Sequence, residues 1–280
     1  MTDPTRTAAG PVSAPPRGGR TAPAWALAGV GVLLQVAYPL LDDRPLRAVT
    51  VASVVCFAAA AVLHAGLTRG PRWAAGLLLV AGGTGFAVEA LGVATGVPFG
   101  TYGYESTLGW KLLGVPVLVP LAWLMLAYPC LLAGRRLAGG RRWTAWALGA
   151  WTLAAWDLFL DPQMVAAGHW SWAFPEPGLP GIPGVPLTNY AGWLVTATVM
   201  MLLLDRLPRS PGDGRLPGDA VPAAVLLWTY ASQLLANLAF FGRPAVALWG
   251  GLAMGLTVVP YALALRRDRL PTGAGTPAEA

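Results

Sequence analysis

Seven polar or acidic side chains interrupt the long apolar stretches of this sequence, and their chemistry needs an explanation. They are Gln35, Glu89, Asp157, Asp161, Asn189, Gln233 and Asn237. A carboxyl group in hydrocarbon costs several kcal/mol unless it faces a partner or a wet cavity. A buried carboxyl group can keep its proton and act as an acid, and a second carboxylate or an amide can hold a water molecule. The first hypothesis is therefore that these residues form a functional site inside the membrane.

The elements that must position these residues are eight apolar segments, each close to the roughly 20 residues that a membrane-spanning helix needs. They are 24–41, 48–67, 72–94, 112–134, 143–162, 188–205, 221–241 and 245–265. Only 11% of the residues are charged, against roughly 25% in soluble domains. We therefore predict an all-α, polytopic helix bundle in the cell membrane. It has about eight transmembrane helices, or seven if 188–205 does not fully cross.

The basic residues predict the orientation of this bundle. With the N-terminus inside, fifteen Lys and Arg residues fall on the inner side and four on the outer side. Such a bias is typical of cytoplasmic loops, so both termini are predicted to be cytoplasmic. It also explains the net charge of +6 without a nucleic-acid partner. The domain prediction is a disordered tail at 1–22, one transmembrane domain at 23–266 and a second disordered tail at 267–280.

In this topology all seven polar residues lie in the outer half of the membrane, on five different segments. The sequence thus predicts one shared pocket. Asp157 and Asp161 are four residues apart and project from one helix face. Ala81 and Gly85 continue the helical stripe of Glu89, and small residues let a neighbouring helix approach closely.

Two outer connections, 95–111 and 162–187, are aromatic and rich in Gly and Pro, and we expect them to roof the pocket. Asp161, directly before Pro162, is expected at a helix end, where a capping or turn role is as plausible as catalysis. His169 is expected to be exposed at the membrane interface.

Three stretches resemble a known family, the membrane carotenoid-biosynthesis proteins that include bisanhydrobacterioruberin hydratase and carotenoid 1',2'-hydratases of that type. They are EALGVATGVPFGTYGYESTLGWKLLGVPVLVPLAWLMLAYP at 89–129, AAWDLFLDPQMVAAGHWSW at 154–172 and GVPLTNYAGWLV at 184–195. The resemblance departs after Trp172, where PEPGLPGIPGVP is longer and richer in proline.

The resemblance implies hydration of the terminal isopropylidene double bond of an acyclic carotenoid, without a cofactor or a metal. Protonation of the less substituted carbon gives a tertiary cation, which water captures. The hypothesis assigns proton donation to Asp157, water activation to Glu89 and orientation to Asp161, and the first two roles could be exchanged. The expected substrate-binding residues are Phe99, Tyr102, Tyr104, Trp156, Trp170, Asn189, Gln233 and Asn237.

Other function classes remain open at this point. A membrane lycopene cyclase also protonates a terminal alkene, but an internal double bond then captures the cation. A non-catalytic carotenoid-binding protein or a proton-relaying transporter would also carry intramembrane acids. Prenyl transfer is disfavoured because the loop after Asp157 and Asp161 has no Lys or Arg to bind a diphosphate. The expected partners are a polyene substrate, the lipid bilayer and other membrane enzymes of the carotenoid pathway.

Overall fold

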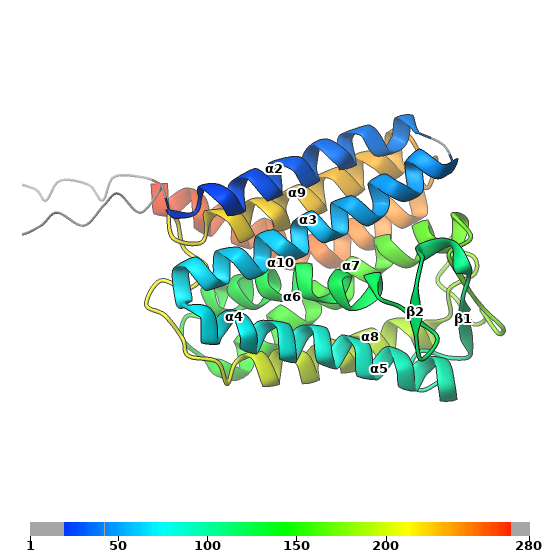
Figure 1. The fold of residues 1–280 in the computed structure, drawn as a ribbon, viewed down its shortest axis with the longest axis horizontal. Coiled ribbons are helices and arrows are strands. Elements are labelled where there is room, and N and C mark those ends of the chain that lie inside the picture. The colour runs from blue at the N-terminus through cyan, green and yellow to red at the C-terminus, as the bar shows by residue number, and fades with distance from the viewer. Residues whose placement is uncertain (1–19, 42, 270–280) are drawn as a thin grey trace, which may run out of the picture.

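The computed structural model describes residues 20–41 and 43–269, which form a bundle of long helices with a few short strands at one end (Figure 1). The helices are α2 (Ala22–Ala37), α3 (Asp43–Arg69), α4 (Pro71–Leu77), α5 (Gly83–Thr95), α6 (Leu118–Leu137), α7 (Arg142–Ala166), α8 (Leu187–Leu204), α9 (Ala220–Ala239) and α10 (Pro244–Arg269). A π-helical turn, η2 (Leu78–Gly82), joins α4 to α5, so these three elements form one rod. Of the two predicted tails, 1–19 and 270–280 lie outside the described residues.

The prediction of a multi-pass helical membrane protein is confirmed by seven helical stretches that are long and apolar enough to span a bilayer. Leu187–Leu204, which corresponds to the segment whose full crossing the sequence leaves open, is one of the seven. The eighth long helix is α7, which is not among them although it has 25 residues. Its two aspartates lower its apolar content.

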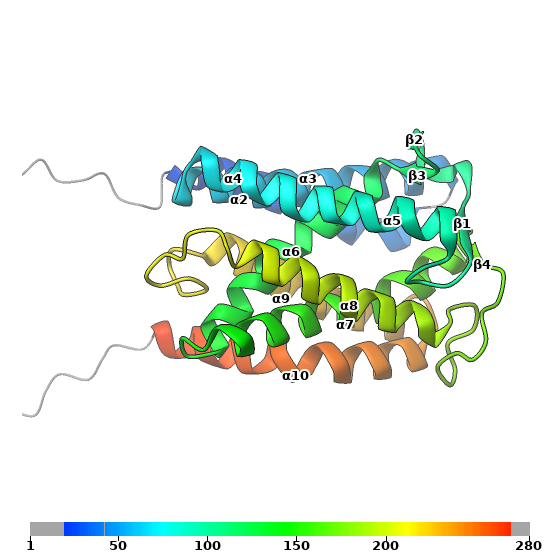
Figure 2. The ribbon, with the colours of Figure 1, turned by 90° about the horizontal axis from the view of Figure 1, so that it is seen from below.

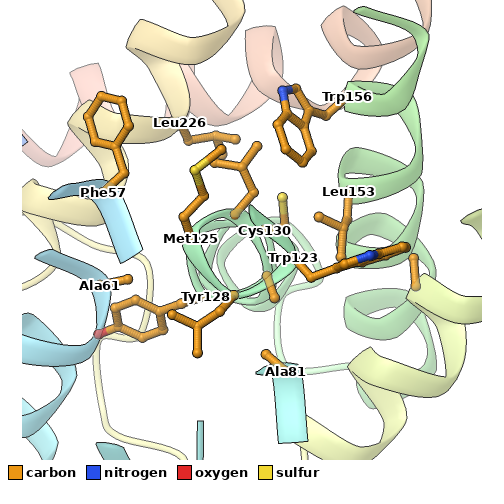
Figure 3. Close-up of a cluster of buried hydrophobic side chains, with 14 of the residues drawn as sticks. Phe57, Ala61, Ala81, Trp123, Met125, Tyr128, Cys130, Leu153, Trp156 and Leu226 are labelled. Atoms are coloured by element: carbon orange, nitrogen blue, oxygen red, sulfur yellow. The ribbon is translucent and has the colours of Figure 1, made fainter. Parts of the chain in front are cut away.

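Helix α6 forms the centre of the bundle. Figure 3 shows it end-on, ringed by Phe57, Ala61, Leu153 and Leu226 from neighbouring helices. Nearly all of α6 is buried, and it contacts α3, α5, α7, α8, α9 and α10. The segment predicted to be helical from 112 becomes helical only at Leu118. The preceding residues form a tight hairpin of β2 (Lys111–Leu112) and β3 (Val115–Pro116).

The hairpin has a simple backbone cause. Its two turn residues, Leu113 and Gly114, both have positive φ angles, of 49° and 81°. Two-residue hairpin turns favour such angles because their twist matches that of the flanking strands. This turn and Pro116 keep the chain out of a helical conformation.

The two ends of the bundle differ in character. Both ends of the described chain lie at one end, and the strands lie at the other, which we call the roof end (Figure 2). The opposite end contains a buried ion-pair network. Arg135 pairs with Asp205 at 3.0 Å and with Asp213 at 2.7 Å, and Arg69 pairs with Asp213 and Asp219. The network fastens the segment between α8 and α9 to α3 and α6.

Candidate active site

Glu89, on α5, is held by three hydrogen-bond donors from other elements. The Tyr102 and Tyr104 hydroxyls donate to its Oε2 at 2.5 and 2.7 Å, and Trp123 Nε1 donates to Oε1 at 3.0 Å. Only 4% of the Glu89 surface is exposed. Hydrogen bonds donated to a carboxylate favour its charged form.

Glycines on α5 make these contacts possible. A Cβ at Gly85 would lie 2.9 Å from the Trp123 ring, and one at Gly92 would lie 2.7 Å from the Tyr102 hydroxyl. The predicted small-residue stripe thus lets α6 approach α5, and it brings Trp123 against Glu89. Nothing in the sequence pattern singles out Trp123 for this contact.

Asp157 and Asp161 form the second acidic group, and one residue of α8 connects them. The Asn189 side-chain nitrogen donates to Asp157 Oδ2 at 2.8 Å and also to Asp161 Oδ2. The three side chains are almost fully buried. Asp157 Oδ1 has no hydrogen-bond partner among residues 20–41 and 43–269. Two carboxyl groups this close to one amide nitrogen favour a state in which they share a proton.

The expectation that Asp161 ends its helix is wrong, because α7 continues through Pro162 to Ala166. Pro162 removes one backbone donor, but the helix is not broken there. Asp161 therefore points from the same regular helix face as Asp157, and a capping role is not supported.

One cavity of about 350 Å³ connects most of the predicted site residues. Of the predicted site residues, Glu89, Phe99, Tyr102, Tyr104, Trp156, Asp161, Trp170, Asn189 and Gln233 line it. Asp157 does not line it, but accepts a hydrogen bond from Asn189, which does. Asn237 does not line it either. Its side-chain nitrogen instead donates to the Gln233 carbonyl at 2.9 Å.

The two connections expected to form a roof are paired with each other. Strand β1 (Tyr102–Tyr104) runs antiparallel to β4 (Trp170–Trp172), with Tyr102 opposite Trp172 and Tyr104 opposite Trp170. The Tyr102 and Trp172 rings stack at 5.6 Å, and the Tyr104 and Trp170 rings meet edge-on at 5.4 Å. The pairing places four aromatic rings along this wall of the cavity.

The hydroxyl groups of Tyr102 and Tyr104 stay protonated at neutral pH and act as hydrogen-bond donors. Burial raises the pKa of both hydroxyl groups, and the neighbouring charge of Glu89 raises it further. Tyr102 and Tyr104 therefore keep their protons and direct them at Glu89.

His169 is not exposed, contrary to the sequence-based expectation. It is 4% exposed, and its Nδ1 lies 2.7 Å from the Thr107 hydroxyl. Burial lowers its pKa, and the charge of Arg47 lowers it further, so the ring is neutral at pH 7. His169 ties the two roof connections together and does not line the cavity.

Trp193, on α8, is a further cavity residue that the sequence pattern does not predict. Its ring stacks on that of Trp123 at 3.7 Å and meets Trp156 edge-on at 6.0 Å. All three rings line the cavity. Trp156 Nε1 is buried without a hydrogen-bond partner among the described residues, so it is available to an acceptor inside the cavity. Membrane helices with many Trp residues give no signal that would single out these three.

Two comparisons with known proteins point to carotenoid biosynthesis. The family described as "Carotenoid biosynthesis protein" matches residues 48–259. Bisanhydrobacterioruberin hydratase from Haloarcula japonica is 33% identical over 171 residues, or 58% of this chain and 57% of that protein. The match thus spans less than two thirds of this relative. No solved structure matches the chain.

Proposed function

Because this chain belongs to the carotenoid biosynthesis protein family, we propose that it hydrates the terminal isopropylidene double bond of an acyclic carotenoid. The product is a tertiary alcohol. One observation carries the proposal: Glu89 and Asp161, from different helices, line one largely apolar cavity. The hydratase activity named for the relative is the same class of reaction.

The Asp157–Asp161 pair supplies the proton. Both residues lie in a water-poor site where two negative charges would repel each other, so the pair retains one proton. Asp161 faces the cavity and Asp157 does not. Asp161 therefore delivers the proton to the less substituted alkene carbon. Asp157 shares the proton of the pair and does not contact the substrate. This geometry favours exchanging the roles that the sequence analysis gives to the two aspartates.

Glu89 is the base that activates water. Three donors offset part of the cost that burial imposes on its charged form, which suits a group that must accept a proton. Water held by Glu89 attacks the tertiary carbon of the cation, and a new C–O bond forms as Glu89 takes a water proton. That proton then returns to the aspartate pair, so that one water is consumed for each double bond.

Aromatic faces protect the cation before water reaches it. Trp123, Trp156 and Trp193 present electron-rich rings to the cavity, and such rings attract a positive charge. The free Trp156 Nε1 can donate to the incoming water or to the new hydroxyl group.

The test is expression in a bacterium that makes lycopene, followed by mass analysis of the extracted pigments. The wild-type chain should add one or two waters, and Glu89→Gln and Asp161→Asn should add none while accumulating in membranes. Glu105→Gln, at an exposed roof position, is the matched control and should behave as wild type. Cyclised products of unchanged mass would assign a cyclase instead, and unmodified pigment would remove the enzymatic proposal.

A further inference from the structure

The cavity is too small for the substrate that the proposed function requires. Its volume of about 350 Å³ is near the low end of pockets that enclose a drug-sized ligand, which run from roughly 300 to 1,000 Å³. A C40 carotenoid is much longer than such a ligand. Only one end of the chain can lie at Glu89 and Asp161, and the remainder must leave the cavity somewhere.

The cavity reaches the outside of the bundle between α2 and α9. Three of its lining residues are also among the exposed apolar residues: Val36 on α2, Leu235 on α9 and Phe240 just after α9. Val36 and Leu235 are 52% and 60% exposed, within helical stretches that are apolar enough to face lipid. A side chain that faces both the cavity and the exterior marks the edge of an opening.

Two contacts frame this opening along the helices. Toward the roof end, the rings of Tyr38 and Phe241 meet edge-on at 6.0 Å, with the Arg243 guanidinium 5.4 Å from the Phe241 ring centre. Deeper in the bundle, Trp228 Nε1 donates to Gln35 Oε1 at 2.7 Å. The first contact joins the segments that follow α2 and α9 at the roof end. The opening between the two contacts faces sideways, toward the hydrocarbon.

We infer that this opening, framed by Val36 and Leu235, is a lateral portal through which the acyclic polyene enters from the bilayer and from which its unreacted part extends. The inference rests on the proposed function for the reaction at the buried end, but the portal itself binds hydrocarbon. The free-energy cost of moving an apolar chain between apolar side chains within the membrane is small, whereas a route through the roof would expose the chain to water.

The test narrows the portal and uses an internal control. The substitutions Leu235→Trp and Val36→Trp, which we call the rim variants, place a larger side chain at the edge of the opening. Leu238→Trp alters a residue of α9 that is equally exposed, at 62%, but does not line the cavity. Each full-length variant is expressed with a long acyclic carotenoid and, separately, supplied with a C10 acyclic hydrocarbon that carries the same isopropylidene end. The amounts of hydrated product and of carotenoid retained by the purified protein are measured.

The rim variants should lower carotenoid retention, and the ratio of long-chain to short-chain product, by about tenfold or more, because much of the bound polyene length is displaced. Leu238→Trp should match wild type in both. Unchanged retention in the rim variants, or an equal loss in Leu238→Trp, would overturn the portal. So would an equal loss of long-chain and short-chain hydration. If the wild-type chain hydrates neither substrate, the proposed function fails, and the retention measurement still decides the portal.

Discussion

The Asn189 side-chain nitrogen lies 2.8 Å from Asp157 Oδ2, and through this contact α8 holds the acid-bearing face of α7. The same nitrogen reaches Asp161, so one neutral donor serves two carboxyl groups. The hydrogen-bonding capacity of the pair is only partly used, since Asp157 Oδ1 has no hydrogen-bond partner among the described residues. This unpartnered oxygen can carry a proton that the two carboxyl groups share.

Replacing Asn189 should disable the pair without removing either acid. Asn189→Leu has a similar size but no donor, and it should lower hydration by roughly 10²-fold, as loss of one preorganised donor does at other active sites. Thr196→Val, on the same helix, removes a buried hydroxyl without a described partner and should leave the rate unchanged. Product yield per membrane-bound protein is the measurement, and equal yields from both variants would contradict the role of Asn189.

The position of Tyr102 depends on the absence of a side chain at Gly92. Gly92→Ala puts a methyl group 2.7 Å from the Tyr102 hydroxyl and should push it away from Glu89. We expect hydration to fall by roughly tenfold or more, because a water-activating carboxylate loses a positioning donor. Gly83→Ala, on the same helix with nothing within 4 Å of the new methyl, should have no effect on yield.

The ion-pair network at the end opposite the roof should determine stability and not catalysis. Asp205→Asn removes a buried carboxylate that pairs with Arg135 at 3.0 Å, and breaking a buried pair costs roughly 3–5 kcal/mol. The Tm in detergent should fall clearly, and the hydration rate of the remaining folded protein should not change. Asp268→Asn, which breaks a pair on a more exposed aspartate, should lower the Tm less.

The same residue gives a pH signature. Burial alone would raise the pKa of Asp205, but hydrogen bonds from Trp146, Arg142 and Arg209 outweigh it and lower the pKa below 3.8. A lowered native pKa contributes stability above that value, which is lost as the pH falls through the native pKa. The Tm difference between wild type and Asp205→Asn should therefore be constant near neutral pH and shrink below about pH 4. A difference that grows on acidification would refute this assignment.

The sequence predicts the bundle and the level of its polar residues, because spacing along a helix fixes depth. It does not predict which side of a helix each residue faces. Asn237 lies on α9 but does not line the cavity, and the same limit hides the cavity-facing role of Trp123. Strands of three residues carry no periodic signal, so the pairing of β1 with β4 cannot be predicted from the sequence. The continuation of α7 through Pro162 depends on packing within the bundle.

The measurement that tests the account most directly is turnover of an acyclic carotenoid by the purified protein in deuterium oxide enriched in oxygen-18. Proton delivery from the aspartate pair and water delivery from Glu89 predict one carbon-bound deuterium beside a carbinol that contains oxygen-18, in every hydrated end group. Deuterium without oxygen-18 would mean that a double bond captured the cation, and pigment carrying neither label would contradict proton transfer at this site.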